Sequence, residues 1–189
     1  MLENMRKDAE ENRAAIVAAA RDLFAREGID VSMRAIAKEA GVGVATATRH
    51  FPDREGLLEA VIGNALASVD AVIAQRMPRF SADPSGTWSD TIHAIVDLAL
   101  PVVAQQIFPT FAGREMDGIV ERKTAELERI YRPLLTAASS RGLCPPDLPA
   151  VQFHLGIIAL SRPLPAPADK LFPDEMNWLV DVFINGLKP

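Results

Sequence analysis

The chain has 189 residues, 49% hydrophobic and 24% charged, a composition that suits one or two soluble domains with a sizeable core. Its single cysteine, Cys144, excludes an intramolecular disulfide and any zinc site built from several cysteines. The formal net charge of −5 argues against a protein that coats DNA non-specifically, because such affinity comes mainly from neutralising phosphates.

The N-terminal segment is charged and has no apolar stretch, so it lacks the pattern of a secretory signal. No uncharged apolar run reaches the ~18 residues that a membrane span requires. The best candidate, residues 92–112, is interrupted by Asp97, Pro101 and Pro109. We therefore expect a cytoplasmic protein with no membrane partner.

The first 53 residues predict a three-helix unit. Residues 12–27 have the spacing of an amphipathic helix, and Gly28 is expected to end it. The apolar faces of the three helices predict one small core, whose expected members are Ile16, Leu23, Phe24, Ile36, Ala37, Val42, Ala47 and Phe51.

Residues 32–52 predict two short helices that meet at a sharp turn. Ser32 can cap the first helix, and Gly41 supplies the backbone freedom to end it. The second helix, residues 44–50, is too polar to be core, because it carries four hydrogen-bonding side chains: Thr46, Thr48, Arg49 and His50. This arrangement is typical of a helix-turn-helix, which offers its second helix to the major groove of DNA.

Helix–glycine–helix corners also occur in all-α proteins that bind no nucleic acid, so the corner alone leaves both interpretations open. The charge distribution favours DNA. Residues 32–54 hold a surplus of two positive charges, whereas residues 57–189 hold 11 basic and 15 acidic residues. A small basic head on an acidic body is consistent with a regulator whose larger part has another task.

Beyond residue 53 the chain predicts helices and no strands, which makes the expected fold class all-α. These helices cover residues 54–77, 88–100, 115–141, 148–161 and 174–187. Loops rich in proline and glycine separate them, at residues 78–87 and 162–173 most clearly. We expect a helix-turn-helix DNA-binding head, residues 1–53, followed by a larger helical effector-binding and dimerisation domain, residues 54–189.

One spaced pattern runs through the head and into the following helix. It consists of Ile16-x6-Leu23-Phe24-Ala25-x2-Gly28, then Ser32-Met33-Arg34-x-Ile36-Ala37-x2-Ala40-Gly41-Val42, then Thr46-x2-Arg49-His50-Phe51-Pro52-x-Arg54-Glu55-x-Leu57-Leu58. Over about residues 12–62 the chain resembles the TetR family of transcriptional repressors. The family has a three-helix head, a linking fourth helix and a divergent all-α body, which agrees with the predicted helices.

The resemblance implies that residues 44–50 form the recognition helix. The side chains expected to face base edges are Val44, Ala45 and Thr46, because small apolar groups and threonine can contact bases. Arg34 and Arg49 could reach bases or backbone. Phosphate contacts, which set the register on the duplex, are implied for Ser32, Thr48, His50 and Arg54.

Three positions depart from the usual family pattern. The family usually has leucine at the position of Ala47, an aromatic residue at Thr48, and often serine at Gly43. A buried leucine-to-alanine difference costs about 2–5 kcal/mol where neighbours do not compensate. These departures concern DNA affinity and operator choice rather than the fold.

A repressor of this type acts as a homodimer on a palindromic operator, with two heads on half-sites about 34–36 Å apart. In the family the last two helices of each chain form the interface. Here they carry more apolar surface than one core requires, and the expected interface residues are Val151, Leu155, Ile158, Trp178, Leu179, Val182 and Phe183. Ordinary core packing is the alternative explanation of this surface.

The body is expected to bind a small, mostly hydrophobic effector between residues 57–77, 88–112 and 115–135. The candidate ligand-binding side chains are Met77, Trp88, His93, Phe108, Phe111, Met116 and Tyr131. Aromatic and methionine residues at helical spacing also occur in ordinary cores, so both interpretations stay open.

No other chemistry is indicated. The histidines lack acidic or cysteine partners at a metal-motif spacing, and the chain has no nucleophile elbow, P-loop or dinucleotide glycine pattern. We therefore expect no metal, no cofactor and no enzymatic activity. Two alternatives remain, an all-α enzyme that uses a body pocket, and a dimeric helical interaction module whose head has lost DNA binding.

Overall fold

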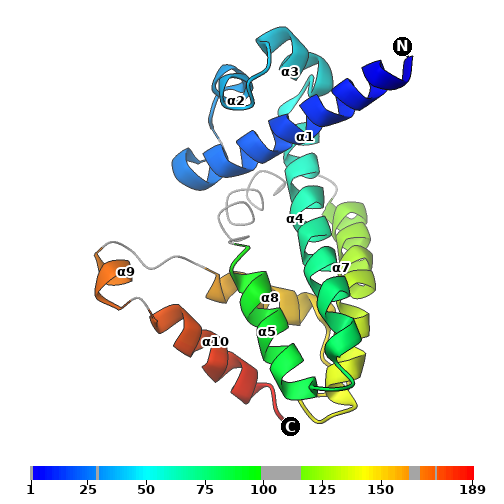
Figure 1. Cartoon of the computed structure of the whole chain (residues 1–189), viewed down its shortest axis with the longest axis vertical. Coiled ribbons are helices and arrows are strands. Elements are labelled where there is room, and N and C mark those ends of the chain that lie inside the picture. The colour runs from blue at the N-terminus through cyan, green and yellow to red at the C-terminus, as the bar shows by residue number, and fades with distance from the viewer. Residues whose placement is uncertain (1, 29, 99–115, 162–166, 173) are drawn as a thin grey trace. The chain divides into compact units, whose positions relative to one another are not determined.

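The computed structural model describes residues 2–28, 30–98, 116–161, 167–172 and 174–189, and these residues contain helices and no strand. The predicted all-α fold class is confirmed. The helices shown in Figure 1 are α1 (Leu2–Glu27), α2 (Met33–Glu39), α3 (Val44–His50), α4 (Arg54–Arg76), the 3₁₀ turn η1 (Met77–Arg79), α5 (Pro84–Val96), α7 (Met116–Ser139), α8 (Ala150–Leu160), α9 (Ala168–Leu171) and α10 (Glu175–Gly186).

The chain forms two compact units whose boundary lies inside α4, between Asn64 and Ala65. The first unit contains α1, α2, α3 and the beginning of α4. The second contains the rest of α4 together with η1, α5 and the helices from α7 to α10. One continuous helix is therefore shared by both units.

The first unit has the small core that the sequence predicts. Ile16, Phe24, Ile36, Ala37 and Ala47 have no exposed surface, and Leu23 and Phe51 are also buried; Val42 is half-buried at the turn. Gly28 ends α1 with a φ of 91°, and its amide donates to the carbonyl of Phe24 at 3.1 Å. This left-handed backbone favours glycine and closes the helix as predicted.

The turn between α2 and α3 is also built as predicted. The Ser32 hydroxyl oxygen accepts a hydrogen bond from the Ala35 amide at 3.2 Å, which caps α2. Gly41 has a φ of 69°, and the next amide, that of Val42, donates to the carbonyl of Ala37 at 3.0 Å. Gly43 precedes α3 without a side-chain cap. The direction in which α3 leaves the turn therefore depends on the glycine at position 41.

α4 begins at Arg54, where the Asp53 carboxylate accepts from the Gly56 amide at 2.8 Å and caps the first turn. Within the described residues, the stretch Arg54–Arg79 is long and apolar enough to cross a membrane by length and composition alone. Core helices of soluble proteins pass the same test, so this is weak evidence. It is a different stretch from residues 92–112, of which residues 99–112 lie outside the described part.

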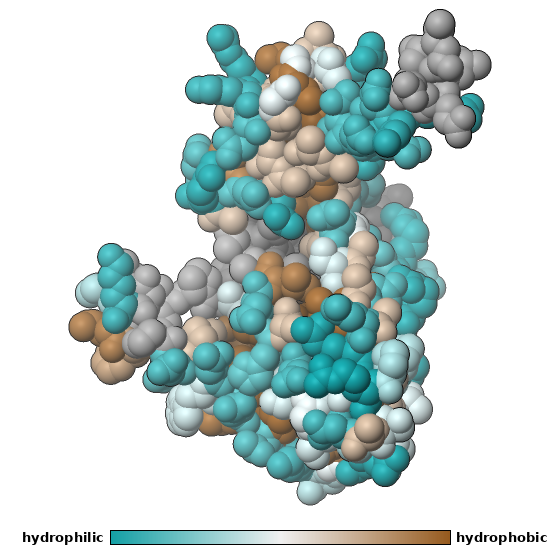
Figure 2. Space-filling model, viewed as in Figure 1, coloured by the Kyte–Doolittle hydropathy of each residue, from teal (hydrophilic) through white to brown (hydrophobic). Residues whose placement is uncertain are grey.

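The structure corrects two predicted helix boundaries in the second unit. α5 starts at Pro84 rather than at residue 88, because proline is favoured in the first turn of a helix and Asp83 caps the Gly86 amide at 2.9 Å. Part of the segment 162–173, predicted to be only loop, forms α9. α9 ends at Leu171, which is exposed together with the following Phe172, and Figure 2 shows a hydrophobic surface there.

In the first unit α1 begins at Leu2, ten residues before the predicted start at residue 12. The remaining helices of the second unit agree with the prediction to within a few residues. α7 contains Pro133, and the chain after it reverses at Gly142, which has a φ of 67°. α8 and α10 lie inside the predicted ranges. Three rings within the core of the second unit form an aromatic core: the ring of Phe153 on α8 stacks on Trp88 of α5 at 5.5 Å and meets the edge of Tyr131 of α7 at 5.4 Å.

The glycine turn yields a first prediction. Gly41→Ala should lower the free energy of unfolding of the head by about 1 kcal/mol, because alanine is strained in the left-handed region even though open space surrounds the site. Gly63→Ala is the matched control. Gly63 lies inside α4 with nothing within 4 Å of an added Cβ, so this change should stabilise by roughly 0.5–1 kcal/mol. Denaturant unfolding of both variants measures the difference, and equal effects would contradict the prediction.

Candidate nucleic-acid interface

α3 rests on the head through one side and leaves the other side exposed. Ala47 in its middle is fully buried, and Phe51 at its end is 3% exposed. Val44 is 46% exposed, and Ala45, Thr48 and Arg49 are also exposed, whereas Thr46 and His50 are half-buried. A seven-residue helix with so little of its own surface in the core presents its remaining side chains outward, as a recognition helix must.

The end of α3 is held by an aromatic anchor. The Phe51 amide donates to the carbonyl of Ala47 at 2.9 Å, and the guanidinium carbon of Arg13 on α1 lies 4.8 Å from the centre of the Phe51 ring. A cation over an aromatic face at this distance is attractive. The C-terminal end of α3 is thereby fixed to α1.

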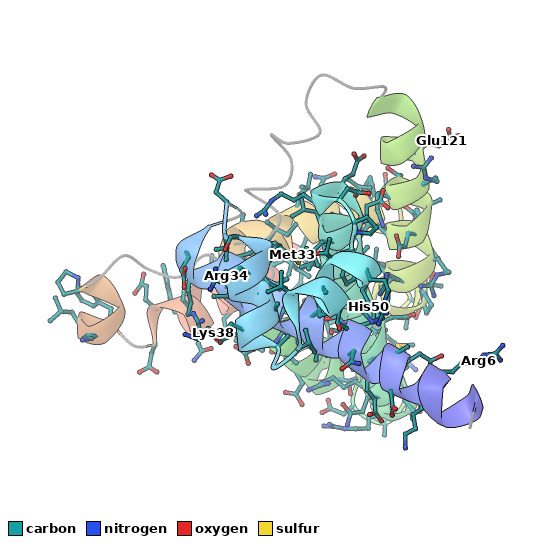
Figure 3. All side chains as sticks on the ribbon, turned by 90° about the horizontal axis from the view of Figure 1, so that it is seen from above. Arg6, Met33, Arg34, Lys38, His50 and Glu121 are labelled. Atoms are coloured by element: carbon teal, nitrogen blue, oxygen red, sulfur yellow. The ribbon has the colours of Figure 1, made fainter. Side chains whose placement is uncertain are left out.

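α2 and α3 carry positive side chains that few acidic side chains neutralise. In the described part of the chain, Arg34, Lys38 and Arg49 are exposed and make no ion pair. Glu39, the acidic residue of α2, pairs instead with Arg26 of α1 at 3.1 Å. Figure 3 shows Arg34 and Lys38 on α2 with His50 nearby on the neighbouring short helix. These cations remain available to phosphates or bases.

Lys38 was not among the residues expected to contact DNA. It lies four residues after Arg34, which places the two side chains on the same face of α2. This spacing is readable in the sequence and could have identified it. Ser32, which was expected, is exposed, and its oxygen accepts the capping bond from Ala35. The hydroxyl hydrogen of Ser32 therefore stays available to donate to a phosphate oxygen.

Arg54 differs from these exposed cations because its side chain contacts the interior of the head. Its Nη1 donates to the carbonyl of Val31 at 2.9 Å, and its guanidinium carbon lies 5.4 Å from the centre of the Phe24 ring. Both partners belong to the interior of the head, where Val31 is 9% exposed and Phe24 is fully buried. The phosphate role that the resemblance implies for Arg54 stays a prediction.

Comparison with known proteins agrees with this geometry. The family model described as bacterial regulatory proteins, tetR family, matches residues 16–61. Over 59 residues the chain is 51% identical to the HTH-type transcriptional regulator SAUSA300_2515 of Staphylococcus aureus, an alignment that covers 31% of the chain and 32% of that relative. The chain thus spans about a third of the length of the curated relatives it matches.

Solved structures extend the similarity to nearly the whole chain. The TetR transcriptional regulator SCO0520 from Streptomyces coelicolor is 25% identical, with a TM-score of 0.63 over 94% of this chain and 98% of that one. The head of the chain thus matches the TetR family over residues 16–61, and the chain as a whole is similar in fold to TetR-family regulators. A TetR transcription regulatory protein from Mycobacterium vanbaalenii, 24% identical over 98% of this chain and 99% of that chain, shares the fold with a TM-score of 0.58.

These matches confirm the resemblance found in residues 12–62. The family model covers the helix-turn-helix head, and the curated relatives share this part of the chain. The curated relatives are named as transcriptional regulators, which is not an enzymatic role. The exposed face of α2 and α3 is accordingly the surface of this TetR-family head that is suited to DNA.

The body places the candidate effector residues in different surroundings. Trp88 and Tyr131 are buried in the aromatic core and both contact Phe153, a residue that the sequence analysis did not single out. His93 instead faces α10, where its Nε2 lies 2.9 Å from the Asp181 carboxylate. Met77 is half-buried at η1. Phe108, Phe111 and the side chain of Met116 lie outside the described residues.

Two hydrogen-bond donors in α5 are buried without partners in the described part of the chain. They are the indole Nε1 of Trp88 and the hydroxyl of Thr87, both on residues that are 1% exposed. The neighbouring Thr91 hydroxyl, by contrast, donates to the Thr87 carbonyl at 2.6 Å. A buried donor without an acceptor is costly, so these two groups suit a site that receives an acceptor from elsewhere.

The expected dimer residues on α8 and α10 form a partly exposed apolar surface. Leu155, Trp178 and Val182 are 49%, 57% and 49% exposed, and the half-buried members are Val151, Ile158, Leu179 and Phe183. The two helices approach closely at Gly156, where an added Cβ would lie only 2.8 Å from the Phe183 ring. Val180 and Ile184 bury the opposite face of α10.

The other groups that could carry chemistry are occupied or enclosed. Cys144 is buried, and burial raises the pKa of its thiol, which makes it a poor nucleophile. Among the described residues no group of three or more histidine, cysteine or acidic side chains could hold a metal ion. Tyr131 donates or accepts at 2.9 Å with Nδ1 of His154, and desolvation lowers the pKa of His154 to about 4.

The burial of His154 predicts that the second unit becomes less stable in acid. The pKa of His154 is lower in the folded chain than in the unfolded one, so protonation favours the unfolded chain. The residue therefore does not reduce the unfolding free energy at neutral pH, but it reduces it increasingly as the pH falls below about 6.5. The wild type should lose about 2 kcal/mol of unfolding free energy between pH 7.5 and pH 5 from this residue. His154→Gln should remove that loss, as measured by urea unfolding at the two pH values.

Tyr131→Phe is the matched control for this measurement. It removes the hydroxyl that meets Nδ1 of His154 but leaves the imidazole enclosed, and desolvation is the cause of the shift. The acid-dependent loss should therefore persist in Tyr131→Phe. An equal loss in His154→Gln and in the wild type would contradict the assignment.

Proposed function

We propose that the protein is a ligand-responsive repressor that binds a palindromic operator as a homodimer and is released by a small, mostly hydrophobic effector. The observation that carries the DNA part is the outward face of α3, where Val44, Ala45, Thr48 and Arg49 are exposed around a buried Ala47. Small side chains on this face allow the helix backbone to come near base edges, and Arg49 adds a long donor that can reach guanine or phosphate.

The body supplies the dimerisation and effector functions in this proposal, and the functional division falls at residues 1–53 and 54–189. The regulator works in the cytoplasm, where its operator is accessible. Support for a homodimer comes from the exposed apolar residues of α8 and α10, since contiguous exposed apolar surface marks interaction sites. The interface consists of these two helices from each chain, packed in a four-helix arrangement.

The effector site includes the aromatic core around Trp88 and Tyr131. Its support is the pair of unpartnered donors, Trp88 Nε1 and the Thr87 hydroxyl, which favour an apolar compound carrying a hydrogen-bond acceptor. In a Trp178→Phe chain Trp88 is the sole tryptophan, so its fluorescence reports this core. Compounds that release the protein from DNA should change that fluorescence, and release without any change would contradict the site.

A substitution in α3 tests operator binding. Arg49→Ala should weaken binding to a duplex selected by the wild-type chain from a random library by about 5- to 100-fold, because one base or phosphate contact is lost. Arg141→Ala is the control, since Arg141 is an exposed arginine of the second unit and its loss changes the net charge equally. Fluorescence anisotropy over a series of salt concentrations measures both variants.

Two outcomes would contradict operator binding through the exposed face of α3. Failure to enrich any palindromic duplex would favour the helical interaction module whose head has lost DNA binding. Equal affinities for Arg49→Ala and the wild type would remove α3 from the interface. A steep fall of affinity with rising salt is expected in either variant that still binds, because phosphate contacts release counterions.

The dimer is tested on α10. Val182→Glu places a charge in the exposed apolar surface and should convert dimers into monomers at about 10 μM protein, because an unpaired charge is costly to bury in an interface. Asn177→Glu adds the same charge to an exposed position of the same helix outside the set of interface residues, and should leave the dimer intact. Sedimentation velocity distinguishes the two. A wild-type monomer at this concentration would contradict the proposed dimer.

A further inference from the structure

Arg54 has an unusual position among the cations of the head. It is the first residue of α4, and its guanidinium reaches back to the connection between α1 and α2. Nη1 donates to the Val31 carbonyl at 2.9 Å while the guanidinium lies over the buried ring of Phe24 at 5.4 Å. A single side chain thus joins the start of α4 to both the end of α1 and the segment that follows it.

The partner of Arg54 lies directly before the start of α2. Val31 precedes Ser32, whose hydroxyl and carbonyl oxygens accept from the Ala35 amide at 3.2 and 3.0 Å. The Ser32 carbonyl also accepts from the Ile36 amide at 3.1 Å. A bond that fixes the Val31 carbonyl therefore fixes the residue next to Ser32, the cap of α2. α2 in turn leads directly into the turn before α3.

Two of the three guanidinium nitrogens of Arg54 are committed inside the head. Nη2 of Arg54 is buried and has no hydrogen-bond partner in the described part of the chain, and Nη1 is engaged with Val31. A phosphate contact requires N–H groups that reach solvent. Arg34, Lys38 and Arg49, in contrast, are exposed and make no ion pair within the described residues.

We propose that Arg54 is a positioning residue, which fixes the start of α2 against α4 and α1 and thereby sets the orientation of the recognition helix, rather than a phosphate contact. The proposal rests on the proposed operator binding by α3. It follows that a lysine, which keeps the charge but lacks the planar fork, cannot replace Arg54.

The first test uses the free protein and needs no DNA. In Arg54→Lys and Arg54→Gln the amides of Ala35 and Ile36 should exchange with deuterium about tenfold faster than in the wild type, the factor expected from the loss of one charge-assisted hydrogen bond that stabilises their surroundings. Arg49→Lys is the matched control and should leave this exchange unchanged. Wild-type exchange rates in both Arg54 variants would overturn the proposal.

The second test uses DNA and separates positioning from phosphate contact. On the duplex selected by the wild type, Arg54→Lys and Arg54→Gln should lose affinity by similar factors, because both lack the bond to Val31. A phosphate contact predicts instead that lysine retains the affinity and that glutamine reduces the salt slope by about 0.9. That second pattern would overturn the proposal. If the wild type itself selects no duplex, operator binding fails while the exchange test still decides the role of Arg54.

A measurement on the wild type covers the case in which the variants do not fold. With ¹⁵N-labelled arginine, the Arg54 guanidinium should show slowly exchanging Nη1 hydrogens in the free protein, and its signals should keep their shifts when the selected duplex is added. The Arg49 guanidinium signals should shift under the same conditions. Rapid exchange in the free protein, or a large DNA-induced shift at Arg54, would overturn the proposal.

Discussion

The docking of α3 through Ala47 and Phe51 is the contact on which the DNA-binding face depends. A helix of seven residues does not form by itself in water, since isolated helices shorter than about 12–15 residues are marginal. Packing must therefore supply its stability. Ala47 contributes a single methyl group, whereas burial of a phenylalanine side chain is worth roughly 1.5–3 kcal/mol, so Phe51 is the main apolar anchor. Arg13 covers the ring of that anchor from α1.

Docking through one side of α3 explains how the head of an acidic chain can present a face that is suited to DNA. Because one side of α3 suffices to hold it, the other side is available for recognition, and the nearby α2 adds Arg34 and Lys38. The net charge of −5 keeps the sequence-independent part of the affinity low. A weak non-specific background raises the ratio of specific to non-specific binding, which is the quantity that matters on a genome.

Local features of this fold could be predicted from the sequence, and long-range pairings could not. Gly28, Gly41 and Gly142 end helices in the left-handed backbone that such positions favour, and Ser32 caps α2, because these rules involve only neighbouring residues. Proline both breaks and begins helices, so the sequence predicts a loop at Pro84, whereas in the structure Asp83 caps a helix that starts there. α9 is too short to show any periodicity.

The candidate sites divide in the same way. The exposed residues of α3 could be identified because the family spacing fixes the register of a short helix. The surroundings of Arg54 and His93 could not, since Val31 and Asp181 lie 23 and 88 residues away from them in the chain. Periodicity placed Trp88 and Tyr131 on inner faces, but it could not show that Phe153 of α8 joins them. Such contacts depend on how helices cross, which one sequence does not specify.

The junction of α7 and α8 gives the body a physical means to connect the proposed effector site with the proposed dimer interface. Glu128 of α7 accepts from the Ala150 amide at 3.2 Å, so α7 caps the first turn of α8, and Arg132 holds the same carboxylate and lowers its pKa. One turn further, Tyr131 of α7 meets His154 of α8. These contacts make the direction of α8 depend on that of α7. An effector bound against Tyr131 would thus act on α8 directly, and it would shift the regulator between states only through a difference in its affinity for them.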